Sequence, residues 1–156
     1  MELKEIRNEK KITQLDAANL LGISLRSYKS YENEIDKKST KKYTYLCEAL
    51  SKYNQIDEEH GILSLESIRE GVTKVLNNYE VNFCYLFGSY AKGYAKDNSD
   101  VDLLIDTDVT GLKYFGLVEE LRVELKKEVD LLRLKDNLKN LDLMKDIMKE
   151  GTKIYG

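Results

Sequence analysis

The sequence is poor in the residues on which several common kinds of site depend. Its 156 residues include two cysteines, one histidine and no proline. Cys47 and Cys84 lie far apart without metal-ligand spacing, and His60 is the only histidine. A zinc site and a catalytic Ser-His or Cys-His pair therefore lack their parts. We expect both thiols to be buried apolar residues, with a disulfide between them as the less favoured alternative.

Long apolar segments are also missing. No run approaches the 18 or so apolar residues of a membrane span, and the first residues lack the basic-then-apolar pattern of a signal peptide. The apolar share of 42% and the charged share of 34% are those of an ordinary folded protein. The sequence therefore predicts a cytoplasmic protein that makes no contact with a membrane.

Charge is distributed unevenly along the chain. Residues 1–55 hold 11 basic and 8 acidic residues, a net charge of +3, whereas residues 56–156 hold 14 and 20, a net charge of −6. A basic first part suits nucleic acid, and an acidic second part suits a metal ion or a basic protein, although both could be plain surface charge. We expect the two parts to meet different partners.

The first part has the pattern of short helices, because its apolar residues recur at steps of three and four. Thr13 with Asp16 three residues on is an acidic variant of a capping box, and Gly22 sits where a helix must end. Ser24 can cap the next helix. We predict an all-α domain over residues 1–55 and a polar linker over residues 56–64.

The remaining residues alternate between helical and strand patterns. Helical spacing is found over residues 63–78, 112–127 and 138–148, and strand composition over residues 81–87, 101–105 and 129–134. Such alternation is typical of a layered α/β fold. We predict a small α/β domain over residues 65–156.

A Gly-Ser turn follows the first predicted strand. Gly88 lets a backbone approach a phosphate closely, Ser89 offers a hydroxyl and an N–H, and Lys92 offers a positive charge. The first amides of a helix after such a turn would add donors. Taken alone, Gly-Ser is more often a simple turn from strand to helix.

Three aspartates form the second element of the predicted site. Asp100 and Asp102, two residues apart on a strand, would place their carboxylates on one face, where Mg²⁺ with substrate phosphates would relieve their repulsion. Asp130 is the only acidic residue within an apolar run, and its burial would be costly unless it were paired or metal-bound. The alternatives are a solvated turn for the first two and a solvated strand edge for Asp130.

Together these elements predict a site for nucleotidyl transfer. Two Mg²⁺ ions held by Asp100, Asp102 and Asp130 could clamp an in-line displacement on ATP, with Gly88, Ser89 and Lys92 at the phosphates. Because this chemistry depends mainly on positioning and on charge neutralisation, it needs no catalytic histidine. Asp130 is the candidate general base.

The stretch from Gly88-Ser89 through Lys92-Gly93 to Ser99-Asp100-Val101-Asp102 resembles the signature of the MNT minimal nucleotidyltransferases within the polymerase-beta-like superfamily. The likeness extends over residues 65–156 and implies a mixed sheet in that domain. It also implies that the Gly-Ser pair holds ATP phosphates, that the aspartate pair binds Mg²⁺ and that Asp130 completes the site. Lys92 stands where an arginine is frequent, which keeps the charge but loses bidentate geometry.

Members of that family are often antitoxins. The resemblance implies a type VII-like antitoxin that transfers AMP from ATP onto a tyrosine of a HEPN-type ribonuclease toxin. The sequence does not decide between a homodimer, a hetero-oligomer with that toxin and other assemblies.

The segment from Thr13 to Asn33 resembles the Xre/Cro-type helix-turn-helix. In this fold the second helix of the motif enters the major groove of DNA. The resemblance implies that Leu25, Arg26 and Lys29 would face bases and that Gln14 and Asn33 would approach phosphates, so that the protein would repress its own operon. A net charge of +3 is small for phosphate binding, and the alternative is a module that docks a partner or forms a dimer.

Two other functions compete with this interpretation. One is a DNA-binding regulator whose transferase domain is catalytically idle, which the intact aspartates argue against. The other is transfer to a small molecule such as an aminoglycoside, which the short chain, without a further domain to hold such a substrate, argues against.

Overall fold

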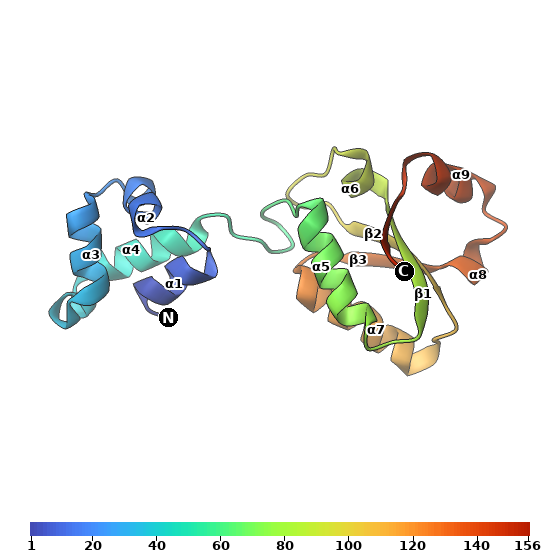
Figure 1. Cartoon of the computed structure of the whole chain (residues 1–156), viewed down its shortest axis with the longest axis horizontal. Coiled ribbons are helices and arrows are strands. Elements are labelled where there is room, and N and C mark those ends of the chain that lie inside the picture. The colour runs from blue at the N-terminus through green and yellow to red at the C-terminus, as the bar shows by residue number, and fades with distance from the viewer. The chain divides into compact units, whose positions relative to one another are not determined.

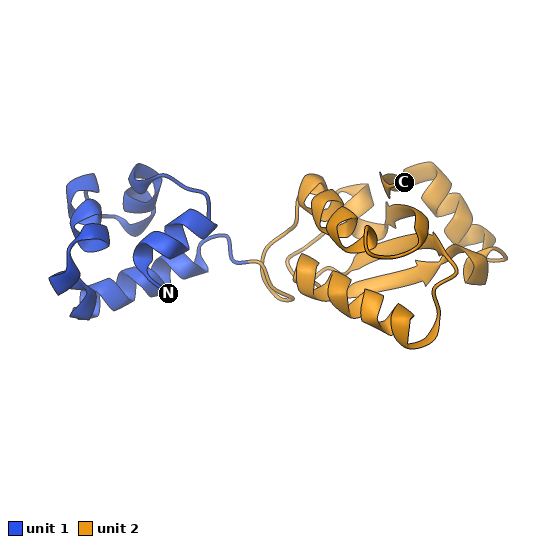
Figure 2. Cartoon of the chain, turned by 60° about the horizontal axis from the view of Figure 1, so that its bottom comes forward, with its two compact units in different colours: residues 1–55 blue, residues 56–156 orange.

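The computed structural model describes residues 1–156, and the chain divides into two units, residues 1–55 and residues 56–156 (Figures 1 and 2). The first unit is entirely helical, and the second combines helices with a four-stranded sheet. The predicted fold class, an all-α domain followed by a small α/β domain with a mixed sheet, is confirmed. No helix is long and apolar enough to cross a membrane.

The first unit contains five short helices around one apolar core. They are α1 (Leu3–Glu9), α2 (Gln14–Leu21), α3 (Leu25–Asn33), the 3₁₀ helix η1 (Ile35–Ser39) and α4 (Lys41–Lys52). The core takes residues from each α-helix: Leu3, Ile6, Ala17, Ala18, Tyr28, Tyr43, Leu46 and Leu50. Together, α2 and α3 form the predicted helix-turn-helix.

Capping residues set the ends of the helices in this motif. The Thr13 hydroxyl accepts the Asp16 amide, and the Asp16 carboxylate accepts the Thr13 amide. Gly22 ends α2 in the left-handed conformation, with φ of 69°, and the Ser24 hydroxyl caps α3. The capping box, the turn glycine and the Ser24 cap are therefore all confirmed.

A buried ion pair connects α1 to α3. Arg7 donates two hydrogen bonds to the Glu32 carboxylate, at 3.1 and 2.8 Å, and the Glu32 side chain is only 1% exposed. Burial acts to raise the pKa of Glu32, but the Arg7 guanidinium together with the Tyr28 and Gln14 side chains outweighs it, so that the pKa lies below its usual value. The pair fixes the helix that the sequence predicts to enter DNA.

The second unit is built on a mixed sheet in the order β3-β2-β1-β4. The central strands β1 (Val81–Phe87) and β2 (Val101–Thr107) are antiparallel, β3 (Val129–Arg133) is parallel to β2, and β4 (Thr152–Tyr155) is antiparallel to β1. The helices are α5 (Leu65–Leu76), α6 (Gly88–Lys92), α7 (Gly111–Leu125), α8 (Leu134–Asn137) and α9 (Leu141–Glu150).

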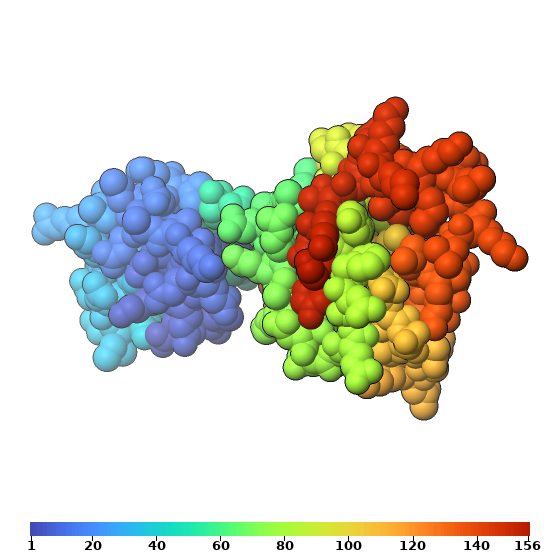
Figure 3. All heavy atoms as spheres, turned by 45° about the vertical axis from the view of Figure 1, so that its right-hand side comes forward, coloured from blue at the N-terminus to red at the C-terminus, as the bar shows by residue number.

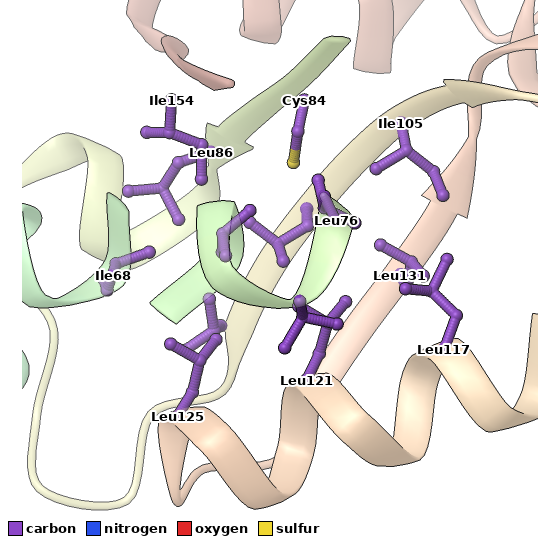
Figure 4. Close-up of a cluster of buried hydrophobic side chains, with 14 residues drawn as sticks. Ile68, Leu76, Cys84, Leu86, Ile105, Leu117, Leu121, Leu125, Leu131 and Ile154 are labelled. Carbon is purple, nitrogen blue, oxygen red and sulfur yellow. The ribbon is translucent and has the colours of Figure 1, made fainter. Parts of the chain in front are cut away.

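Alternation along the strands gives the sheet two different faces. Leu86, Leu103 and Leu131 point to one face, where they pack against Ile68 of α5 and Leu121 of α7 in the main core (Figure 4). The other face carries Phe87 and Leu104, and Ile147 of α9 packs on them. Because Asp102 is two residues before Leu104, and Asp130 two before Leu132, both aspartates belong to the α9 face.

Several details differ from the sequence expectations. The last predicted helix, residues 138–148, is confirmed as α9 but begins later, at Leu141, where the Asn140 side chain caps it. The short helix α8 that precedes it was not predicted. Strand β4 was not predicted; Figure 3 shows this C-terminal segment, in red, on the surface beside β1. Residues 56–64, expected as a linker, form no helix or strand and group with the second unit.

The two cysteines are free. Cys84 is buried in the main core, and burial raises the pKa of its thiol. Cys47 is only half-buried beside the core of the first unit. The expectation of buried apolar thiols therefore holds fully for Cys84 and only in part for Cys47.

Candidate functional site

The turn between β1 and α6 depends on a glycine. Gly88 has φ of 69°, a left-handed conformation that side chains disfavour. A Cβ built on Gly88 would lie 2.1 Å from Oδ2 of Asp102, far inside contact distance. Glycine is thus required both by the backbone conformation and by the approach of the carboxylate on the neighbouring strand.

The first turn of α6 leaves its backbone donors free of side-chain caps. Phe87 stands at the N-cap and makes no capping hydrogen bond. The first amides of a helix have no partner within it, and the helix dipole makes this end partially positive. Ser89, half-buried at the second position of α6, adds a hydroxyl. This end of α6 can therefore receive an anion.

Asp102 and Asp130 are direct neighbours across β2 and β3. The parallel register pairs Asp102 with Asp130, and the antiparallel register pairs Asp102 with Phe87, next to the Gly88 turn. Burial first, then the charges of Asp130 and Asp100, raise the pKa of Asp102 to about 6. The three carboxylates therefore repel one another at this end of the sheet.

Two features of these aspartates correct the sequence argument. Asp130 is exposed on the edge strand β3, so the argument from the cost of burying it is wrong and the alternative of a solvated strand edge holds. Asp100 is also exposed and lies one residue before β2 rather than within it. Asp102 is the half-buried member of the set.

The chemistry of this donor set fits a divalent cation. No three or more His, Cys, Asp and Glu side chains are already arranged together as ligands of one metal ion. Magnesium, however, usually takes one or two carboxylates and completes its coordination with water and substrate phosphates. An ion between Asp102 and its acidic neighbours would relieve their mutual repulsion, and the free end of α6 lies beside it.

Lys92 is engaged at the other end of α6. Its ammonium lies 2.8 Å from a carboxylate oxygen of Asp146 on α9, and this hydrogen bond raises the pKa of Lys92. The ion pair ties α6 to the helix that covers the same face of the sheet. Sequence reasoning did not identify Asp146, because no local signal relates a residue of α9 to the Gly-Ser turn.

The first unit carries a separate candidate site on α3. Arg26, Lys29 and Asn33 are exposed and line one concave surface together with Ser24, Ser27, Ser30, Glu34 and Lys37. Leu25, at the start of α3, and Gln14, at the start of α2, are half-buried and do not line it. Three of the five residues predicted at DNA thus lie together.

Glu34 and Lys37 complete this concave surface. The Ser30 hydroxyl donates to Glu34 at 2.7 Å, and the Lys37 ammonium donates to the Ser30 hydroxyl. Lys37 also lies over the Tyr31 ring, 4.9 Å from its centre. The concave surface therefore carries a carboxylate beside its positive charges.

Comparison with known proteins matches both units to families. Residues 70–156 match the family model described as polymerase beta, nucleotidyltransferase, and residues 3–52 match the model described as helix-turn-helix. The protein adenylyltransferase MntA of Thermococcus cleftensis is 35% identical over 95 residues, which cover 57% of this chain and 94% of MntA. Among solved structures, a chain in a crystal structure of a toxin–antitoxin with AMP-PNP aligns with a TM-score of 0.50 and 25% identity, over 56% of this chain and 73% of that chain.

Proposed function

Because the chain belongs to the polymerase beta nucleotidyltransferase family, we propose that it is a Mg²⁺-dependent protein adenylyltransferase. It would transfer AMP from ATP to a tyrosine of a HEPN-type ribonuclease toxin and so act as the antitoxin. The observation that carries this proposal is the meeting of Asp102 and Asp130 beside the uncapped start of α6. The name of the Thermococcus cleftensis relative supports a protein as the acceptor.

The proposal gives each part of the site a role. The amides at the start of α6 and the Ser89 hydroxyl bind the ATP phosphates, and Gly88 leaves room for their approach. Asp130, exposed at the sheet edge, accepts the proton of the attacking tyrosine hydroxyl. The tyrosine oxygen bonds to the α-phosphorus, the bond from that phosphorus to the bridging oxygen breaks, and pyrophosphate leaves.

Asp102, with Asp100 and Asp130 beside it, would hold the magnesium of the bound nucleotide. When bound, this ion supplies positive charge that offsets the negative charge developing on the phosphate oxygens. The carboxylates contribute negative charge next to the phosphate site, and Lys92 is the one basic residue of α6. In this account Lys92 exchanges Asp146 for a phosphate oxygen of ATP.

A second function, operator binding, is favoured by the concave surface of α3. Arg26 and Lys29 would read base edges and Asn33 would contact a phosphate, while Leu25 and Gln14 would lie at the margin of the contact. Since the residues lie on the second helix of a helix-turn-helix, we propose that the protein represses its own operon through this unit.

Labelled ATP tests the proposed transfer. The full chain is incubated with α-labelled ATP, Mg²⁺ and the product of the neighbouring gene, alongside the Asp100→Ala, Asp102→Ala double variant. We expect label on the neighbouring protein with the wild-type chain only, and none when a chelator removes Mg²⁺. If no protein becomes labelled, the proposed modification of a toxin is wrong.

The same assay separates the competing functions. An idle transferase domain predicts no transfer to any acceptor but an intact gel shift on the upstream DNA. Transfer to a small molecule predicts label on an aminoglycoside in place of the protein.

A further inference from the structure

Lys127 has the only completely buried charged side chain in the chain, with 0% exposure. It lies in the short turn between α7 and β3. Its ammonium donates to two backbone carbonyls, those of His60 at 3.1 Å and of Asp97, and no carboxylate forms an ion pair with it. Because burying an ammonium without a counter-ion is costly, an apolar side chain would suit this position better if filling space were its only role.

One of the two carbonyls belongs to the turn that leads into Asp100. In this turn the Lys96 amide donates to the Ser99 hydroxyl at 2.8 Å, and the Ser99 amide donates to the Lys96 carbonyl at 3.0 Å. The Asp97 carbonyl held by Lys127 lies inside the turn. Lys127 therefore fixes the backbone immediately before Asp100.

The residues that follow Lys127 hold the backbone on the other side of Asp100. The Val101 amide donates to the Glu128 carbonyl at 2.9 Å, and the next pairs in register are Val101 with Val129 and Asp102 with Asp130. Asp100, which lies outside the regular part of β2, is thus held between two contacts made by consecutive residues, Lys127 and Glu128.

We propose that Lys127 is a positioning residue for the nucleotidyl transfer. Its ammonium fixes the turn at residues 96–99 and thereby holds Asp100 beside Asp102 and Asp130. The proposal rests on the proposed function, because it takes Asp100 as a ligand of the nucleotide's metal ion. Lys127 touches neither ATP nor the acceptor; through His60 it also holds the segment that precedes α5.

The test compares Lys127→Met with Lys126→Met in the full chain. Lys126 is the adjacent, exposed lysine, and the same change there removes a charge without removing either carbonyl contact. The measurements are Mn²⁺ binding by paramagnetic resonance, hydrogen exchange of the Val101 amide, and the rate of AMP transfer. Leu121→Val, in the main core, serves as a variant that lowers stability only. Lys127→Gln, which keeps an amide donor, replaces Lys127→Met if the latter does not fold.

We expect Lys127→Met to weaken Mn²⁺ binding by about tenfold, as loss of a group that orients a metal ligand does. The same variant should speed exchange at Val101 and lower kcat more than it raises the KM for ATP, whereas Lys126→Met and Leu121→Val leave Mn²⁺ binding unchanged. Wild-type Mn²⁺ affinity and Val101 exchange in Lys127→Met would overturn the positioning role. If the wild-type chain binds Mn²⁺ but labels no protein, the proposed function fails while the Lys127 comparison stands; a wild-type chain that binds no Mn²⁺ overturns both.

Discussion

The Asp102 carboxylate occupies the space that a side chain on Gly88 would need. A Cβ on Gly88 would lie 2.1 Å from Oδ2 of Asp102, and the turn also holds Gly88 at φ of 69°. The turn at Gly88 and strand β2 therefore approach each other so closely that only a residue without a side chain fits at position 88. This contact joins the two halves of the proposed site.

Gly88→Ala should greatly slow transfer, with a limited loss of stability. The left-handed conformation costs an alanine about 1–2 kcal/mol, and the displaced Asp102 carboxylate should lower the transfer rate by about 100-fold or more. Label transfer and chemical unfolding measure the two effects. As a control, Gly93→Ala changes another glycine with positive φ, at 83°, whose Cβ would meet nothing within 4 Å. Equal losses of activity in the two variants would contradict the role of the Gly88–Asp102 contact.

The ion pair between Lys92 and Asp146 gives a prediction about ATP affinity. If Lys92 leaves Asp146 to bind phosphate, Lys92→Met should raise the KM for ATP several-fold, because a charge-assisted contact is lost. Asp146→Asn should lower the KM, because it frees the ammonium. Steady-state transfer at varied ATP concentration measures both. An Asp146→Asn variant whose KM rises as much as that of Lys92→Met would show that the ion pair itself, not a phosphate contact, is what matters.

The buried pair of Arg7 and Glu32 predicts how the first unit responds to mutation. Glu32→Ala leaves a mostly buried guanidinium unpaired and should lower the free energy of unfolding of this unit by about 3 kcal/mol. The second unit has its own core and should unfold as in the wild type. Thermal unfolding followed by circular dichroism should show one early transition. Simultaneous destabilisation of both units would contradict this expectation.

Low pH, like Glu32→Ala, should lower the free energy of unfolding of the first unit. The pKa of Glu32 is lower in the folded unit than its ordinary value of 4.5, which applies to the unfolded chain. The stabilisation is therefore complete above that value and is lost as the pH falls through the folded pKa. Glu32→Gln should remove this part of the acid dependence.

DNA binding should depend on the exposed side of α3. Arg26→Ala with Lys29→Ala should weaken binding to the upstream DNA at least about tenfold, since each contact contributes about 1–3 kcal/mol. Lys4→Ala with Lys52→Ala removes the same charge from exposed positions on α1 and α4. Gel shifts at fixed salt compare the two pairs. Equal weakening by both would indicate that only net charge matters.

Local signals made much of this structure predictable. The capping pair of Thr13 and Asp16, the turn at Gly22 and the composition of the strands flanking Gly88 each act within a few residues. The helix-turn-helix and the two central strands therefore follow from short patterns.

The features that were missed depend on contacts between distant segments. Strand β4 is four residues long and is defined by pairing with β1. The sequence could not decide whether Asp130 is buried or solvated, because that depends on where β3 lies in the sheet and on what covers it. The contacts of Lys92 with Asp146 and of Lys127 with Asp97 join elements that no sequence period relates.

Asp102→Asn should have opposite effects on stability and on transfer, which together test the role of Asp102 in the proposed site. The pKa of the half-buried Asp102 carboxyl is raised to about 6 by burial and by two neighbouring carboxylates. In metal-free buffer at neutral pH, the variant removes the unfavourable charge of this group. Its unfolding free energy should therefore rise by about 1 kcal/mol, after allowance for solvent screening. When Mg²⁺ and labelled ATP are added back, transfer of AMP to the neighbouring protein should be undetectable with the variant and present with the wild-type chain. A folded Asp102→Asn chain that still transfers AMP at the wild-type rate would contradict the account.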